Sequence, residues 1–238
     1  MYLAVRGVWQ ALRFAVKLPE NVRFSLPKSS HPPKSLNERS LAVAAKKLAA
    51  SDPDLARIVK AYGLPPLWER EPGFATLVYI ILEQQVSLAS AKAAFHRLQT
   101  TLGHITPDSF LTLNQPELKT IGFSRQKTSY AQLLAEAILD RQIDLDILHE
   151  LPDDEVRTTL KQLKGIGDWT ADIYLLMALG RPDIWPRGDL ALVIAMQKIK
   201  QLPARPTAEE FALLGEPWKP FRAVAARLLW HFYLSQSR

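Results

Sequence analysis

From residue 36 onward the sequence repeats one pattern: apolar residues recur three or four positions apart in short runs, and a turn or cap residue ends each run. This spacing places the apolar residues on one face of a helix. We find no convincing segment after residue 35 in which apolar and polar residues alternate, so strands are not expected there. The sequence therefore predicts an all-α fold, with residues 22–26 as the candidate for one short strand.

Cap and stop residues divide this region into separate helices. Serine, threonine and aspartate accept hydrogen bonds from the first backbone amides of a helix, and glycine tolerates the left-handed torsions that end one. Residues 74–84 are apolar on nearly all sides, which predicts a helix in the interior. Leu88 is expected to face the core at the start of the next helix. The expected helix starts are Ser35, Ser87, Thr106, Ser124, Pro152, Asp189, Thr207 and Pro220, with a break and restart near 51–53, and the expected stops include Gly103, Gly122, Gly165 and Gly180.

Composition excludes several classes of protein. The chain has 238 residues, a formal net charge of +6 and no cysteine. The absence of cysteine excludes zinc fingers, iron–sulfur clusters and thiol nucleophiles, and it fits a reducing compartment. The positive charge favours a polyanionic partner without establishing one. No apolar run approaches the roughly 18 residues that a membrane span needs.

Proline and serine concentrate between residues 18 and 35, which is the composition of a linker. We therefore interpret residues 1–35 as an N-terminal extension and linker. Residues 36–238 are expected to form the folded domain.

The stretch Gly165-Ile166-Gly167 lies between two helical patterns. So short a connection is expected to need glycine torsions at both ends and to turn the Ile166 side chain back between the helices. It also leaves backbone amides exposed at a helix N-terminus, where a phosphate can bind without any readout of base identity. Lys161 and Lys164 would strengthen such a site. The alternative is that the glycines only join two helices tightly.

The hairpin motif is part of a longer pattern, and three other blocks accompany it. The hairpin lies within L-x-G-I-G-x-W-T-A-x-x-x-L, and Asp189 follows at a helix start; the others are ILEQQVSLASAKAAFHRL (81–98), GFSRQKTSYAQLLAEAI (122–138) and WKPFRAVAARLLWHFY (218–233). Over residues 36–235 the chain resembles the helix-hairpin-helix DNA glycosylases, most closely the 3-methyladenine-DNA glycosylase II family. The resemblance implies two helical subdomains with the active-site cleft between them. The N- and C-terminal helices would form one subdomain, and about residues 85–190, with the hairpin, the other.

Asp189 is the residue on which the family's essential aspartate falls. A helix N-terminus favours an ionised carboxylate, and a fixed negative charge stabilises the oxocarbenium character that develops at C1′ as a base leaves. The same residue can serve simply as a helix N-cap, and the two roles are compatible.

The family also indicates which chemistry is missing. Bifunctional relatives carry a lysine two residues after the second hairpin glycine, where this chain has Trp169. The adenine-mismatch branch carries a glutamate where this chain has Ile80, and it needs cysteines for its cluster. We therefore predict a monofunctional enzyme in which water attacks C1′.

Trp169 and Trp230 line the base pocket by resemblance. Electron-rich rings attract a cationic alkylated purine beyond ordinary stacking. Plain core packing is the alternative for both residues. Relatives place a tyrosine where this chain has Ile173, which leaves the range of substrates open.

The remaining predicted contacts are with DNA. Gln85 occupies the position from which relatives insert a side chain into the gap behind an extruded nucleotide; an ordinary solvated residue is the alternative. Ser124, Arg125 and Lys127 are candidates for backbone phosphates, although a solvated helix start explains them as well. The full set of predicted DNA-binding residues is Lys164, Gly165, Ile166, Gly167, Thr170, Gln84, Gln85, Ser124, Arg125 and Lys127.

The sequence thus predicts a DNA glycosylase of base excision repair that removes alkylated purines of the 3-methyladenine type. Two alternatives stay open: a glycosylase for deaminated or oxidised bases, and a non-catalytic module that binds DNA through the hairpin. We expect no organic cofactor and no metal among the catalytic groups. Family members can hold a monovalent cation at the hairpin. The expected partner is double-stranded DNA with damaged bases, and the expected state is a monomer in the cytoplasm, at the nucleoid in a bacterium.

Overall fold

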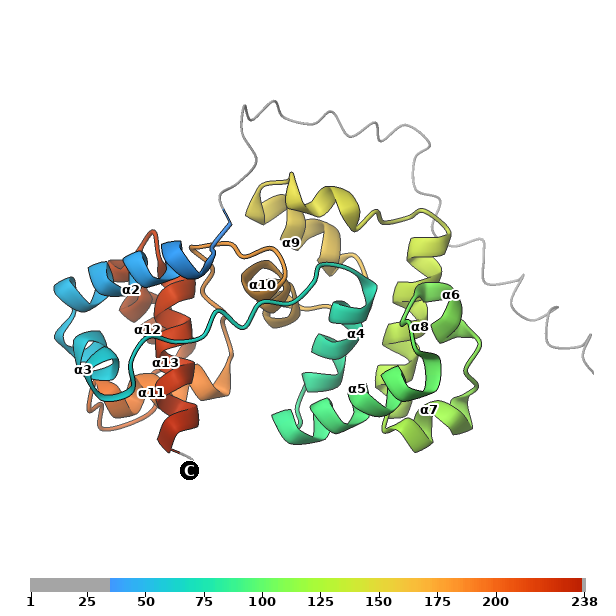
Figure 1. Cartoon of the computed structure of the whole chain (residues 1–238), viewed down its shortest axis with the longest axis horizontal. Coiled ribbons are helices and arrows are strands. Elements are labelled where there is room, and N and C mark those ends of the chain that lie inside the picture. The colour runs from blue at the N-terminus through green and yellow to red at the C-terminus, as the bar shows by residue number, and fades with distance from the viewer. Residues whose placement is uncertain (1–34, 237–238) are drawn as a thin grey trace, which may run out of the picture. The chain divides into compact units, whose positions relative to one another are not determined.

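The computed structural model describes residues 35–236, and this part of the chain is helical throughout, with no strand (Figure 1). The predicted all-α class is confirmed. The candidate strand over residues 22–26 lies outside the described residues. The helices are α2 (Glu38–Ser51), α3 (Pro53–Tyr62), α4 (Phe74–Glu83), α5 (Leu88–Leu102), α6 (Pro107–Leu111), α7 (Gln115–Ile121), α8 (Arg125–Leu139), α9 (Asp153–Lys161), α10 (Asp168–Met177), α11 (Leu190–Ile199), α12 (Ala208–Gly215) and α13 (Arg222–Gln236), with short 3-10 helices η2 (Asp146–His149) and η3 (Glu216–Trp218).

Most predicted helix starts are confirmed. The Ser87 and Ser124 side chains accept from the third amide of their helices, and Thr106 and Thr207 form capping boxes. Asp52 separates α2 from α3 and caps the second of them, which explains the predicted break.

Three local expectations are wrong. Leu88 is 57% exposed because the whole turn before α5 faces solvent. The last helix begins at Arg222 rather than Pro220, since the amide of Phe221 closes a turn onto the carbonyl of Trp218. Helix α9 ends at Lys161, several residues before the glycine expected to stop it.

Helix α4 occupies the interior, as its apolar sequence predicts. Eight of its residues are buried, and it packs against α5, α8 and α10. Helix α13 is the second buried element and packs against α2, α3 and α11. The C-terminal helix therefore lies with the N-terminal ones, while α4 to α8 form their own set of contacts.

Two stretches without α-helix run between these sets of helices in Figure 1: residues 63–73 before α4 and residues 178–189 before α11. The start of α10, which follows the hairpin, lies near the start of α11, because Trp169 bonds to Asp189. The division into two subdomains with a cleft between them stays a prediction. None of the described helices has the length and apolar character that crossing a membrane requires.

Candidate active site

Asp189 stands immediately before α11. Gly188 has a φ of 76°, a left-handed torsion that favours glycine, and it turns the chain into the helix. The Oδ1 atom of Asp189 then accepts a hydrogen bond from the amide of Leu192 at 2.9 Å. The N-cap interpretation is confirmed, and it holds the carboxylate at the positive end of the helix with 9% of the residue exposed.

Both predicted pocket tryptophans reach this carboxylate. Trp169, from the first turn of α10, donates its Nε1–H to Oδ2 of Asp189 at 3.0 Å. Trp230, from α13, donates its Nε1–H to Oδ1 at 3.2 Å. An indole N–H can only donate, so these contacts, together with the backbone bond, complement a negative charge on Asp189.

This geometry gives the two tryptophans a contact that the sequence did not predict, and their place in a base pocket stays a prediction. The sequence indicated ring faces that stack on a base, and the structure adds indole edges that orient the carboxylate. Trp169 is partly exposed and Trp230 is 8% exposed. The spacing of residues 169, 189 and 230 in the sequence contains no signal for a shared hydrogen-bonding partner.

The hairpin follows the predicted design in part. Gly165 has a φ of 95°, and the Ile166 side chain turns inward with 5% exposed, as expected. Gly167 has an extended backbone, φ −100° and ψ −173°, so the expectation of a glycine torsion at both ends is wrong. The amide of Gly167 donates to no acceptor among the described residues and lies at the start of α10.

The two glycines should respond differently to the same substitution. A Cβ on Gly165 would lie 2.2 Å from the Tyr130 ring, at a φ that is already unfavourable, whereas nothing lies within 4 Å of a Cβ on Gly167. We expect Gly165→Ala to lower the free energy of unfolding by about 2 kcal/mol, within the range for strained backbone sites. Gly167→Ala should change it by less than about 0.5 kcal/mol. Urea denaturation of both variants measures the difference, and equal stabilities would contradict this account of the hairpin.

Gln84 and Thr170 support the hairpin from within. The Gln84 amide, at the end of α4, donates to the carbonyl of Gly165 at 2.9 Å and to the Thr170 hydroxyl at 3.0 Å. The Thr170 residue is only 2% exposed. Both side chains are thus used inside the protein to hold α4 against the hairpin, and contact of either residue with DNA stays a prediction.

Two of the lysines predicted to contact or strengthen a phosphate site have partners within the protein, and their role toward DNA stays a prediction. The Lys127 ammonium donates to the carbonyl of Leu82 at 2.7 Å, and burial lowers the pKa of Lys127 below its usual value. Lys161 forms an ion pair with Asp168 at the start of α10, so its charge is compensated. Neither lysine offers a free cation at the surface.

The other predicted DNA contacts remain accessible. Lys164 and Arg125 are exposed, and their side chains bond to no other described residue. Ser124 is exposed at the start of α8, where its hydroxyl accepts from the amide of Lys127. Gln85 is exposed with a left-handed φ of 56°, which makes it the tip of the turn between α4 and α5. Contact with DNA stays a prediction for all four.

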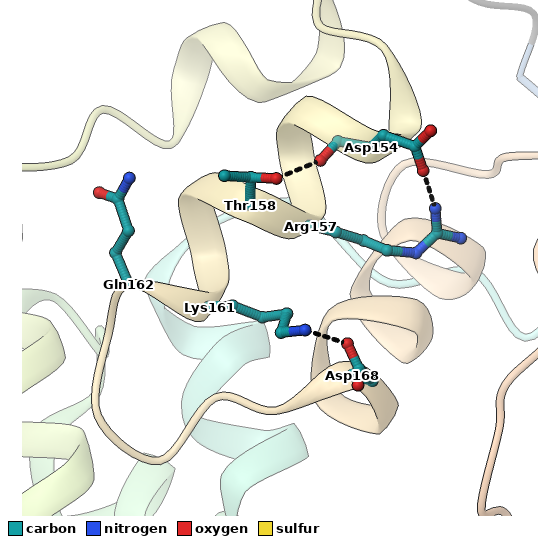
Figure 2. A pocket seen from close by; sticks show the side chains of 6 residues that line it. All are labelled: Asp154, Arg157, Thr158, Lys161, Gln162 and Asp168. Carbon is teal, nitrogen blue, oxygen red and sulfur yellow. Dashed lines mark hydrogen bonds and ion pairs between the residues drawn. The ribbon is translucent and has the colours of Figure 1, made fainter.

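An open hollow of about 400 Å³ lies beside the hairpin on α9, and its charged side chains are paired with one another (Figure 2). Figure 2 shows Lys161 pointing to Asp168 and Arg157 pointing to Asp154. Arg157 also donates its Nε–H to Asp172 of α10 at 2.7 Å. Because opposite charges compensate one another here, we interpret these side chains as contacts that hold α9 against α10, and we do not interpret the hollow as a binding site.

The fold and this arrangement define an all-α protein in which a helical hairpin lies next to an aspartate that caps a helix. Residues 78–220, more than half of the chain, match the family described as the HhH-GPD superfamily of base excision DNA repair proteins. The chain belongs to this superfamily. The resemblance identified from the sequence motifs is thereby confirmed.

Within this superfamily, the chain is similar to proteins named as alkylbase or 3-methyladenine DNA glycosylases. The chain is 29% identical over 195 residues to the alkylbase DNA glycosidase-like protein mag2 of Schizosaccharomyces pombe, covering 79% of this chain and 91% of that protein. It is also 29% identical to DNA-3-methyladenine glycosylase 1 of the same yeast, covering 80% and 87%. Among solved structures, the Schizosaccharomyces pombe 3-methyladenine DNA glycosylase Mag1 in complex with abasic DNA aligns with a TM-score of 0.72 at 27% identity, covering 79% of this chain and 95% of that one.

Proposed function

We propose that the protein is a monofunctional DNA glycosylase that hydrolyses the N-glycosidic bond of alkylated purines, chiefly N3-methyladenine, and leaves an abasic site. One observation carries the proposal: the Asp189 carboxylate is fixed by three hydrogen-bond donors next to a hairpin suited to a phosphate. The similarity to relatives named as 3-methyladenine glycosylases supports the choice of substrate.

Asp189 acts through its charge. Cleavage of the bond leaves positive charge on the sugar, and a preorganised carboxylate stabilises that charge without reorganising during the reaction. A carboxylate offers about four acceptor positions. Three are used by Leu192, Trp169 and Trp230, so one acceptor position remains for the sugar or for the attacking water.

The absence of lyase activity follows from Trp169. An indole nitrogen has no basic lone pair with which to attack C1′, and here its N–H is committed to Asp189. Water is therefore the nucleophile, and the product is an intact strand with an abasic site.

The hairpin binds the DNA backbone. The Gly167 amide lies at the N-terminus of α10, where a phosphate can bind. The exposed Lys164 adds one cation that no carboxylate of the described residues compensates. Arg125 and Ser124, at the start of α8, add a second backbone contact, and Gln85 enters the space behind the everted nucleotide. We propose that the enzyme acts as a monomer on damaged duplex DNA in the cytoplasm or at the nucleoid. A monovalent cation among the hairpin carbonyls belongs to the proposal as an optional structural element.

A panel of duplexes, each with one defined lesion, tests this function. The wild-type protein should release free methylated purine from alkylated DNA, and the strand should break only after treatment with alkali. Release from deaminated or oxidised duplexes alone would reassign the substrate. Binding to every duplex without release of any base would favour a non-catalytic module.

Lys164 should contribute a phosphate contact that is independent of base sequence. Lys164→Gln is expected to weaken DNA binding similarly on all duplexes and to reduce the slope of log K against log salt by about 1. Lys127→Gln is the matched control, because that ammonium is bonded to the Leu82 carbonyl and should leave the slope unchanged. Fluorescence anisotropy across salt concentrations measures both, and equal slopes for Lys164→Gln and wild type would remove Lys164 from the interface.

A further inference from the structure

The stretch between α3 and α4, residues 63–73, contains no helix, yet it is fixed at several points (Figure 1). The buried guanidinium of Arg227, on α13, donates its Nε–H to the carbonyl of Leu67 at 2.8 Å and an NH2 group to the carbonyl of Leu176 at 2.7 Å. Arg70 forms a bidentate pair with the buried Glu83 at 2.9 and 2.7 Å. These contacts tie the stretch to α13, α10 and α4.

Trp68 lies between the two arginine-fixed points and has an unusual backbone. Its φ is 49°, in the left-handed region, which is unfavourable for a bulky side chain. Such a torsion persists only where the surroundings impose it, and strained torsions of this kind cluster at functional sites. Here the anchors at Leu67 and Arg70 leave the intervening residues little freedom.

This torsion directs the Trp68 ring to the tryptophan that holds the candidate catalytic carboxylate. The Trp68 ring lies edge-on to Trp230, with centroids 6.4 Å apart and the planes at 74°. His231 contacts the same ring at a centroid distance of 6.4 Å. Trp230 in turn donates to Asp189. Trp68 is half-buried.

We propose that Trp68 forms an additional wall of the base site and contacts the everted, positively charged purine. The inference rests on the proposed glycosylase function. It adds a specificity-determining residue that comes from the connection between helices and not from the hairpin or α13. Arg227 is the positioning residue for this wall, because it holds the carbonyl that precedes Trp68.

The chemistry explains why an aromatic ring is suited to this place. A nucleotide alkylated at N3 of adenine or N7 of guanine is cationic, and the face of an indole attracts a cation more strongly than an aliphatic surface does. Eversion costs the stacking energy of the nucleotide, so an extra aromatic contact raises the population of the everted state. The ring is held in advance by the linker, which limits the entropy lost on binding.

Three substitutions at Trp68 separate this role from a structural one. Trp68→Gly removes the ring and also relieves the left-handed torsion, Trp68→Leu keeps apolar bulk without an aromatic face, and Trp68→Phe keeps an aromatic face. The assay is single-turnover release of 7-methylguanine, a cationic lesion, from a duplex with enzyme in excess. The second measurement is the Kd for a duplex with a tetrahydrofuran abasic-site analogue, which contains no base for Trp68 to contact.

We expect the Gly and Leu variants to release the base about tenfold more slowly, the Phe variant to stay within about threefold of wild type, and all three to bind the abasic analogue with wild-type affinity. Tyr62→Leu is the control, because it removes a neighbouring ring that touches His231 and Phe232 but has no contact with Trp230 among the described ring pairs. Wild-type release rates in the Gly and Leu variants would overturn the inference, as would a parallel loss of abasic-site binding in all three. A wild-type protein that releases no methylated base would instead contradict the proposed function, and this inference with it.

Discussion

Replacing Asp189 by asparagine is expected to lower the rate of release of methylated base about 1,000-fold, the upper part of the range for removing one preorganised electrostatic group. Asparagine keeps a side-chain oxygen and remains a good helix N-cap, so α11 should still form. It loses the negative charge that stabilises the sugar in the transition state. Single-turnover kinetics on an alkylated duplex measures the effect.

The hydrogen bonds to Asp189 add a structural consequence to this substitution. The carboxylate accepts from an indole on each oxygen. In asparagine one of the two carboxylate oxygens is replaced by an NH2 group. This group would face the indole N–H of Trp169 or Trp230, and because both are donors no hydrogen bond can form between them. We therefore expect a moderate loss of stability beside the kinetic loss. Binding to an abasic duplex is the control that shows an intact DNA surface, and full activity in the variant would end the mechanistic proposal.

Replacing Arg227 by methionine is expected to have the largest effect on folding, a loss of about 3 kcal/mol in the free energy of unfolding. The side chain is completely buried and donates to carbonyls of Leu67, Leu176 and Ala223. Burial lowers the pKa of Arg227 to about 10, so the guanidinium is still charged at neutral pH and its hydrogen bonds are charge-assisted. Methionine fills a similar volume but leaves the carbonyls of Leu67 and Leu176 without this donor.

Urea denaturation with linear extrapolation measures this loss, provided that the slope with denaturant is unchanged. Arg125→Met is the matched control: the same substitution at an exposed residue should stay within about 0.5 kcal/mol of wild type. A stable Arg227→Met protein would mean that the buried charge costs as much as its hydrogen bonds contribute, which is the known risk for buried ions. That result would leave the position of Trp68 without its explanation.

The fold was predictable because its signals are local. Periodicity and caps located most helices, since a capping serine or threonine acts on amides two or three residues away. The errors occur where distant residues decide the outcome. Leu88 is exposed because its helix begins at an open turn. At the hairpin, the close approach that requires glycine is that of the Tyr130 ring to Gly165, and Gly167 has no such neighbour.

The candidate site was predictable in its residues but less so in its contacts. Motif and order selected Asp189 and both tryptophans. The hydrogen bonds from both tryptophans to Asp189 join α10, α11 and α13. The spacing of these residues in a single sequence does not indicate that they contact one another. Gln84 and Lys127 carry groups suited to DNA, yet the structure uses them on backbone carbonyls of Gly165 and Leu82. Trp68 gave no sequence signal, because its left-handed torsion is imposed by arginines at positions 70 and 227.

The side-chain amide of Gln84 joins the hairpin to the end of α4, and Gln85 is the next residue along the chain. The part proposed to hold the strand is therefore connected to the part proposed to enter the duplex through the Gln84 hydrogen bonds and one peptide unit. The distance between the hairpin and Gln85 is therefore set before the protein meets any damage, so the same distance along the DNA would apply at every nucleotide that the enzyme tests. Lengthening the turn after Gln85 would leave this distance unchanged, whereas loss of the hydrogen bonds of the Gln84 amide would make it variable.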